Sequence, residues 1–206
     1  TTEIYTLSLH DALPICQNHG TDILVIDAPN EDFSHFSGLE ADAIITNQPG
    51  VMIGVTVADC VPILLFDPVK KVIAAVHAGW QGTAARITAQ AVAGMKQVFG
   101  SRPGDIQAAI GPCINSCCYE VDQPVKDGFK AQPDLWNAVA EPAGSGKWRL
   151  DLALANRIQL EDAGLQLAAI QTLAHCVCCQ KEWFFSYRRD EGETGRQMGF
   201  IMLKDA

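Results

Sequence analysis

Residues 57–83, VADCVPILLFDPVKKVIAAVHAGWQGT, carry two short apolar runs that place a cysteine and a histidine close to a glycine-rich segment. The runs, residues 61–66 and 71–76, are separated by an Asp-Pro turn signal, and the second run ends near a glycine. This pattern predicts two buried strands joined by a turn. Cys60 and His77 would then lie at strand ends, where functional sites are commonly built.

The glycine-rich segment GWQGT, residues 79–83, is followed by a pattern typical of a helix. Apolar side chains from Ile87 to Val98 recur at helical spacing until Gly100 ends the pattern. We therefore expect residues 79–83 to form a loop between a strand and a helix N-terminus. Free backbone N–H groups and the helix dipole at such a place favour an anion.

The whole chain predicts an α/β protein of the α+β type, with mixed β-sheets packed with helices in a single domain. Its 206 residues, 48% of them apolar, are enough to bury one full core. Further strands are expected at residues 22–27, 41–46, 50–60, 106–110 and 165–176. A short helix is expected at 123–130 and a longer helix, with Asp151 as its N-cap, at 148–164. Residues 141–147 should form a flexible loop, and residues 181–204 a terminal hairpin.

The net charge of −9 argues against a nucleic acid or an anionic membrane as the main partner, because both favour clustered Lys and Arg. No run approaches the roughly 20 consecutive apolar residues of a membrane span. The N-terminus also lacks the basic start of a secretory signal. We therefore expect a cytoplasmic protein, and any anion that it binds should be small and locally held. Its eight cysteines are expected to stay thiols or to bind metal.

Residues 1–16, TTEIYTLSLHDALPIC, resemble translated sequencing-adapter sequence and match nothing that follows. We expect this segment to be non-native and residues 17–206 to form the one catalytic domain. His10 and Asp11 are therefore left out of the candidate site.

His19, Cys60 and His77 together form a set that zinc accepts. Three protein ligands leave a fourth position open for water, which is typical of a catalytic zinc site. Alternatively, Cys60 is a nucleophile and His77 its base, with Asp59 or another carboxylate orienting the imidazole. Spacing alone does not separate the two, although a dyad has no need of His19.

Further ligand-rich spacing occurs at His175, Cys176, Cys178 and Cys179, and again at Cys113, Cys117 and Cys118. Both sets are also compatible with buried thiols at strand ends. Arg188 and Arg189 lie in a charged segment, where they are either solvated or recognise a phosphate or carboxylate.

Five motifs, in order, resemble one known family: NHG, NQPG with VTVADCVP, VHAGWQGT, IGPCINSCCYEV, and FFSYRRD with TGR. The family is that of the bacterial laccase-domain proteins, once labelled multicopper polyphenol oxidases and also called peptidoglycan editing factors. The resemblance covers residues 17–203 and implies a single-domain enzyme that depends on zinc. The implied activities are phosphorolysis of adenosine, inosine and methylthioadenosine, and deamination of adenosine.

Carried over by motif, the zinc ligands are His19, Cys60 and His77, and Asp59 is a candidate proton carrier beside the metal. Phosphate would be held by residues that the resemblance places near the ribose: Gly79, Gln81, Gly82, Thr83, Arg188 and Arg189. Copper is disfavoured, because a multicopper oxidase needs on the order of ten imidazole ligands. This chain has five histidines.

Two departures from the family pattern matter. Gln81 stands where the family often has Arg, and the Arg-Gly-Gly motif expected before the first metal histidine is replaced by the adapter-like segment. We therefore expect a truncated chain and keep two alternatives. One is a metal-free Cys–His hydrolase acting on cell-wall amides, and the other is an inactive zinc-binding module. A monomer and a homodimer are both compatible with the sequence.

Overall fold

A six-stranded mixed sheet forms the centre of the molecule in the computed structural model, which describes residues 15–28 and 38–204. The two outer pairs, β1/β2 and β6/β10, are parallel, and the three inner pairs are antiparallel. In spatial order the strands are β1 (Ile23–Ile26), β2 (Ala43–Thr46), β5 (Val72–Ala78), β4 (Val61–Asp67), β6 (Gln107–Ile110) and β10 (Ile170–Thr172).

The predicted pair of buried strands is confirmed as the β4–β5 hairpin at the centre of this sheet. Every residue of β5 is buried, as expected for a continuous apolar run covered on both faces. Its turn is fixed by Asp67, whose Oδ1 accepts the backbone N–H groups of Val69 and Lys70 at 2.8 and 2.9 Å. Lys71 completes the turn with a φ of 55°.

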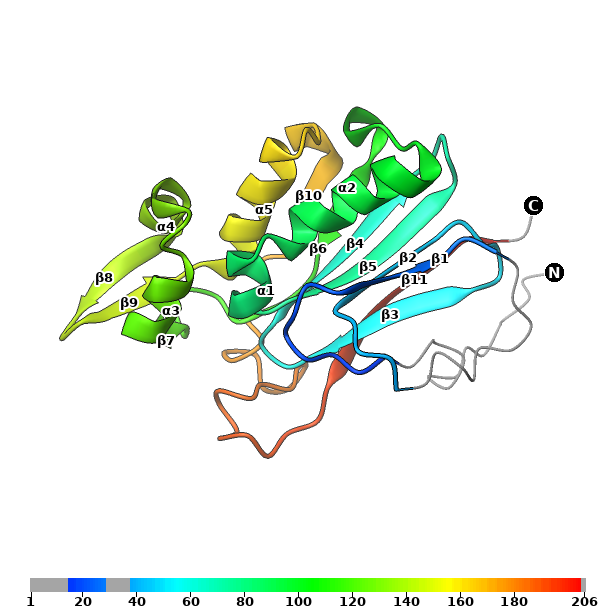
Figure 1. Cartoon of the computed structure of the whole chain (residues 1–206). Coiled ribbons are helices and arrows are strands. Elements are labelled where there is room, and N and C mark those ends of the chain that lie inside the picture. Colours follow the sequence, from blue (N-terminus) through cyan, green and yellow to red (C-terminus); the bar gives the residue numbers. More distant parts are fainter. Residues whose placement is uncertain (1–14, 29–37, 205–206) are drawn as a thin grey trace.

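Helices cover one face of the sheet (Figure 1). They are α1 (Trp80–Ala84), α2 (Ile87–Phe99) and α5 (Leu152–Asp162). Gly100 ends α2 in the left-handed conformation, and the predicted N-cap Asp151 accepts the N–H of Leu154 at 2.8 Å. The helix predicted at 148–164 begins only at Leu152, because residues 148–150 belong to a strand.

The opposite face is covered by a two-stranded antiparallel sheet of β3 (Met52–Val57) and β11 (Gln197–Met202). A second apolar core, which includes Ile44, Ile53 and Ile73, fills the space between the two sheets. The prediction of a hairpin at residues 181–204 is wrong, because the only strand in this range, β11, pairs with the distant β3. The three layers confirm the predicted α+β class in a single domain.

A third sheet extends from the body of the molecule together with two short helices (Figure 1). The prediction of a flexible loop at residues 141–147 is wrong, because these residues form most of a β-hairpin. The tip of this hairpin, Gly144 to Gly146, has positive φ throughout. Pro142 and the glycines hide this strand from a propensity analysis. The elements are β7 (Glu120–Val121), α3 (Gln123–Gly128), α4 (Pro133–Val139), β8 (Ala140–Gly144) and β9 (Lys147–Leu150).

Two 3₁₀ turns, Pro103–Asp105 and Leu167–Ala169, complete the regular elements of the described residues. None of the described helices has the length and apolar content needed to cross a bilayer. The adapter-like segment predicted at 1–16 lies almost wholly outside the described residues, so that boundary stays a prediction. His10 of this segment, and His35, for which the sequence predicts a solvated loop position, also lie outside the described residues.

Candidate metal centre and pocket

The three predicted metal ligands lie side by side in the structure. His19 comes from the segment before β1, Cys60 directly precedes β4, and His77 lies near the end of β5. One donor atom from each residue lies within 4.8 Å of the other two. The two imidazole rings meet edge to face, with centroids 4.8 Å apart. The β4–β5 hairpin thus joins Cys60 to His77, and the segment before β1 supplies the third ligand.

Asp42, which no motif indicated, holds this arrangement together from a fully buried position. Its Oδ1 lies 2.6 Å from His77 Nδ1 and also accepts the backbone N–H of His19 at 3.1 Å. Its Oδ2 accepts the backbone N–H groups of Gly20 at 2.7 Å and Asn18 at 3.3 Å. One carboxylate therefore orients one ligand's imidazole and the backbone of another ligand.

The same contacts determine the charges in the site. Burial lowers the pKa of His77, but its hydrogen bonds to Asp42 and Cys60 outweigh this effect and raise that pKa to about 9. Burial raises the pKa of Cys60, but hydrogen bonds to His19 and His77 outweigh it and lower that pKa to about 7. Without a metal, the arrangement thus favours a thiolate at Cys60 beside an imidazolium at His77. A bound metal would displace the proton of His77, because histidine ligates metals in its neutral form and cysteine as a thiolate.

The backbone around the site has an unusual conformation at two positions, and a third position, Gly79, is unusually tightly packed. His19 and Asp59 have φ values of 64° and 88°, although neither is glycine. Gly79 has an ordinary φ of −71°, but a Cβ there would lie 3.0 Å from His19 Cδ2 and 3.1 Å from Cys60 Sγ. Only glycine lets the chain pass this close to the two side chains.

The site opens into a cavity of about 760 Å³. Besides the three candidate ligands, the residues that line this cavity include three aromatic side chains, two arginines and two amides: Trp80, Tyr119, Tyr187, Arg188, Arg196, Gln17 and Gln81. The space therefore offers flat apolar surfaces and positive charge next to a His–Cys–His cluster. This combination suits an organic ligand that also carries an anionic group.

Asp59 lies 9% exposed at this cavity and anchors the segment that carries the arginines. Its Oδ1 accepts the hydroxyl of Ser186 at 2.6 Å, and its Oδ2 accepts the backbone N–H of Arg188 at 2.6 Å. The carboxylate thus fixes Arg188 relative to Cys60, the next residue along the chain.

The two predicted arginines point to different places. Arg188 lines the cavity, lies 5.3 Å from the Tyr119 ring centroid and donates to the carbonyl of Glu120 at 2.9 Å. Arg189 does not line it, because its guanidinium forms two 2.7 Å hydrogen bonds to Asp190 and also donates to the backbone. Arg196, which was not predicted as a site residue, lines the cavity instead.

The prediction that residues 79–83 form a loop is wrong, because Trp80–Ala84 form the short helix α1. Gln81 is exposed and lines the cavity, whereas Gly82 and Thr83 are buried and do not. Thr83 Oγ1 accepts a hydrogen bond from Asn156 Nδ2 at 3.0 Å, and its carbonyl accepts one from Gln159 at 2.8 Å. These contacts attach α1 to α5.

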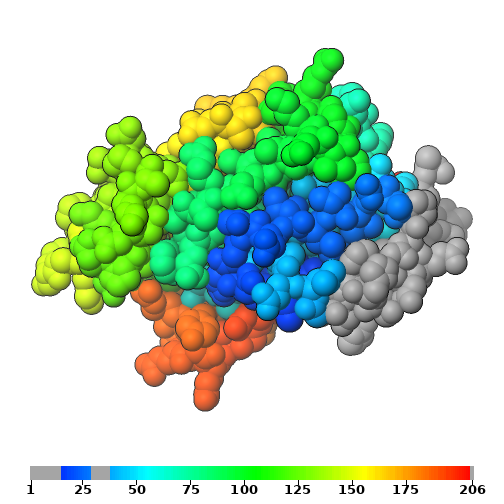
Figure 2. Space-filling model, in the orientation of Figure 1, coloured from blue at the N-terminus to red at the C-terminus, as the bar shows by residue number. Residues whose placement is uncertain are grey.

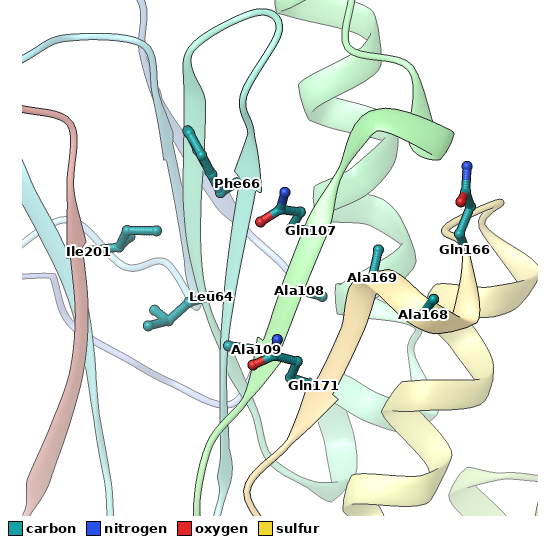
Figure 3. A pocket seen from close by; sticks show the side chains of 10 residues that line it. All are labelled: Leu64, Phe66, Gln107, Ala108, Ala109, Gln166, Ala168, Ala169, Gln171 and Ile201. Carbon is teal, nitrogen blue, oxygen red and sulfur yellow. The ribbon is translucent and has the colours of Figure 1, made fainter.

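A separate cavity of about 530 Å³ lies beside the sheet face near β4, β6, β10 and β11 (Figure 3). Its ten lining residues are apolar or carry neutral amides, and none is charged or a cysteine or histidine. It therefore offers no group for acid–base, nucleophilic or metal chemistry. Among the described residues, groups for such chemistry gather at the cavity of about 760 Å³ and at a group of four cysteines.

Residues 2–204 match the protein family described as multi-copper polyphenol oxidoreductase laccase. The chain belongs to this family. Purine nucleoside phosphorylase YlmD of Bacillus subtilis is 40% identical over 165 residues, which cover 80% of this chain and 59% of that relative. The matched part of this laccase-family chain therefore spans less than two thirds of YlmD.

Two further similarities agree with this assignment to the laccase family. Adenosine deaminase RL5, from an unknown prokaryotic organism, is 38% identical over 203 residues, which cover 96% of this chain and 77% of RL5. The crystal structure of hypothetical protein YfiH from Bacillus licheniformis has a TM-score of 0.89 and 37% identity, and it covers 97% of this chain and 76% of the other. The predicted family resemblance is thus confirmed.

Sequence reasoning missed Asp42, Tyr119 and Arg196. Asp42 carried one signal, because it is a charged residue at the start of the apolar run ADAIIT and becomes fully buried. A buried carboxylate needs partners, and here these are the ligands themselves. Tyr119 and Arg196 lay inside the family motifs, but nothing in their spacing indicated a common cavity.

Proposed function

We propose that this chain is a zinc-dependent purine nucleoside phosphorylase that also deaminates adenosine. The convergence of His19, Cys60 and His77 at the cavity, with Asp42 behind them, carries the proposal. The names of YlmD and RL5 support the two activities.

The donor set supports zinc rather than copper as the metal. Two imidazoles and one thiolate with an open fourth position are typical of catalytic zinc. A blue-copper site also uses two histidines and a cysteine, but it adds a weak axial ligand that is usually methionine. Among the described residues, no methionine lines this cavity. Zinc held by three such ligands supplies a Lewis acid and lowers the pKa of water to near 7.

The chain's own residues prepare this site. Because Asp42 engages His77 at Nδ1, the imidazole is left with Nε2 to offer to the metal, in the orientation that the carboxylate imposes. Asp42 fixes the backbone of His19 at the same time. Cys60 supplies the third ligand as a thiolate, which offsets part of the metal's charge.

The cavity residues would then bind the substrate. Trp80, Tyr119 and Tyr187 provide aromatic faces on which a purine can stack. Arg188 and Gln81 would hold phosphate, with Gly79 behind them at the start of α1. In phosphorolysis a phosphate oxygen bonds to C1′ as the bond to the purine breaks, so holding phosphate near the ribose lowers the barrier chiefly by orientation.

Three predicted residues take indirect roles in this proposal. Thr83 and Gly82 position Gln81 by fixing α1, and Arg189 positions Arg188 through its hydrogen bonds to Asp190 and the neighbouring backbone. Asp59 remains the proposed proton carrier for deamination, since it lies on the cavity beside Cys60.

We further propose a cytoplasmic protein of residues 17–206, monomeric or homodimeric, whose partners are a purine nucleoside and phosphate rather than nucleic acid or membrane. The acidic net charge of −9 supports this choice of partners. A role in peptidoglycan editing, named in the family resemblance, stays a prediction.

The metal-free Cys–His hydrolase is not favoured. Cys60, His77 and Asp42 do form a chain of contacts that a thiol hydrolase could use. However, His19 has no task in such a triad, and YlmD and RL5 carry the names of nucleoside enzymes.

Incubation of the purified chain with inosine and phosphate tests the phosphorylase. We expect hypoxanthine and ribose 1-phosphate in equal amounts, with neither formed when phosphate is omitted. Adenosine without phosphate should give inosine and ammonia. Hypoxanthine with free ribose would instead indicate hydrolysis, and the absence of product from zinc-loaded protein would support an inactive zinc-binding module.

A further inference from the structure

Four cysteines from two separate loops meet away from the His–Cys–His cluster. Cys117 and Cys118 lie between β6 and β7, whereas Cys176 and Cys179 follow β10. Their four sulfur atoms lie within 4.8 Å of one another. The sequence had suggested two separate cysteine groups, and the structure joins part of each. His175 is excluded, because it is exposed and its ring faces Phe184.

The sulfur spacing matches one specific geometry. The separations are 3.8 Å between Cys117 and Cys118, 3.7 Å between Cys117 and Cys179, and 3.3 Å between Cys118 and Cys179. A tetrahedron of thiolates around zinc with ~2.3 Å bonds has sulfur–sulfur edges of ~3.8 Å. A disulfide needs about 2.05 Å, so the sulfurs of Cys117, Cys118 and Cys179 stand at the spacing of metal ligands. The sulfur of Cys176 completes the group within 4.8 Å of them.

The chemistry around the sulfurs also fits a cation. Cys176 and Cys179 are spaced as C-x-x-C, which is a common half of a structural zinc site. The backbone N–H groups of Asn115 and Cys179 face the sulfur of Cys176. Backbone N–H groups that face a ligating sulfur are the outer-shell contacts that metal sites use.

Positive charge lies next to the group. Arg149 donates to the carbonyl of Cys117, and Arg188 lies 3.5 Å from the carbonyl of Cys118. Four thiolates and one divalent cation leave a net charge of −2, which two guanidinium groups offset.

The position of the group gives the metal a structural task. Residues 173–196 contain no helix or strand, which is long for an ordered segment of a domain. The segment begins beside the β6–β7 loop through the backbone pair Cys113 and Cys176. It then forms part of the protruding orange-to-red region of Figure 2 and ends at β11. One metal would cross-link two loops that otherwise have little core of their own.

We propose that Cys117, Cys118, Cys176 and Cys179 bind one structural zinc ion, in addition to the metal at His19, Cys60 and His77. This zinc fixes the loop that carries Tyr119 and the segment that carries Arg188. Cys178, which directly precedes Cys179 in the sequence, does not belong to this group of four ligands.

Metal analysis of the full chain, purified without chelator under reducing conditions, tests this site. We expect two zinc ions per chain in the unmodified protein, one in H19A and one in the double variant C117S/C179S. Combining all three substitutions should leave none. C178S is the matched control and should keep both ions. A total of one zinc in the unmodified protein together with none in H19A would overturn the proposal, as would loss of one ion in C178S.

X-ray absorption at the zinc edge of H19A provides a test that leaves every cysteine intact. Because only the four-cysteine site is filled in H19A, the result does not depend on the proposed enzyme activity. We expect a first shell of four sulfurs at ~2.3 Å. A shell containing nitrogen or oxygen, or an intact mass that reveals a Cys118–Cys179 disulfide in place of zinc, would contradict the assignment.

Discussion

Asp42 Oδ1 lies 2.6 Å from His77 Nδ1, and both side chains are almost completely buried. The same carboxylate accepts backbone N–H groups from the His19 segment. This residue therefore links β5 to the segment before β1 in the proposed metal site. Its contribution to zinc binding is open to direct measurement.

The D42N variant should bind zinc at this site 10- to 100-fold more weakly, because outer-shell partners of ligating histidines typically contribute that much. An amide keeps the shape of Asp42 but removes its negative charge and one acceptor. Competition with a chromophoric chelator measures the change. D22N is the matched control, since Asp22 is exposed. Equal affinities of D42N and D22N would contradict the role of Asp42.

A methyl group at Gly79 should disturb the same site from the other side. In G79A the added carbon would lie 3.0 Å from the His19 ring and 3.1 Å from Cys60 Sγ. We expect at least tenfold weaker zinc binding at this site with little change in melting temperature, because the backbone itself is unstrained. G104A, where the nearest side-chain atom is 3.9 Å away, should bind zinc normally. Normal zinc affinity in G79A would show that the close approach is unimportant.

Arg188 should govern the use of phosphate. Loss of its charge in R188Q removes a hydrogen bond to an anion worth roughly 1.5–3 kcal/mol, which corresponds to a KM for phosphate raised roughly 10- to 100-fold. The KM for inosine should change much less. R102Q is the control, since Arg102 is exposed and does not line the cavity. Steady-state kinetics with phosphate varied checks this, and an unchanged phosphate KM in R188Q would rule Arg188 out as the anion contact.

Asn156 should contribute to stability rather than to chemistry. Its side chain accepts a hydrogen bond from the hydroxyl of Thr88 at 2.6 Å and donates one to Thr83 Oγ1 at 3.0 Å. All three residues are fully buried. N156A leaves these hydroxyl groups without their partner, which costs roughly 1–3 kcal/mol. Thermal unfolding should shift down by about 2–4 °C per kcal/mol. The exposed Asn137 provides the control variant N137A, whose melting temperature should be unchanged.

The Asp190 ion pair predicts a specific pH dependence. Hydrogen bonds from Arg189 and Thr194 lower the pKa of Asp190 from 3.8 to about 2. Because the folded-state pKa is lowered, the pair stabilises the protein fully above about pH 4 and loses its effect as pH falls towards 2. The melting-temperature difference between D190N and the parent should therefore be constant from pH 7 to 5 and shrink below 4. A difference that shrinks between pH 7 and 5 would contradict this pKa.

The sequence predicts the two central strands of the main sheet well, because β4 and β5 are apolar runs with clear ends. The strand predicted at 165–176 is much shorter, since only Ile170–Thr172 form β10 and residues 167–169 form a 3₁₀ turn. The β4–β5 hairpin, β1 and α2 follow from local pattern alone. The pairing of β11 with β3 does not, since it joins residues 140 to 150 positions apart and depends on burying Ile53 against the main sheet. The β8–β9 hairpin was hidden by Pro142, which a strand accommodates only at an edge.

The candidate metal ligands can be predicted from their residue types, but the residues that hold them in place cannot. His19, Cys60 and His77 could be grouped because zinc accepts that donor set. Asp42 could not be assigned, because a carboxylate's partners are set by strand pairing rather than by spacing. The four-cysteine group shows the same limit: Cys117 and Cys179 are 62 residues apart and meet only once the two loops are placed.

Chelator treatment followed by zinc addition tests the central claim most directly. The full chain, stripped of metal, should release no hypoxanthine from inosine and phosphate, and zinc should restore that release. H77A should stay inactive under the same zinc addition. Full activity of the stripped chain, lost on alkylation of Cys60, would contradict the account and identify a thiol enzyme instead.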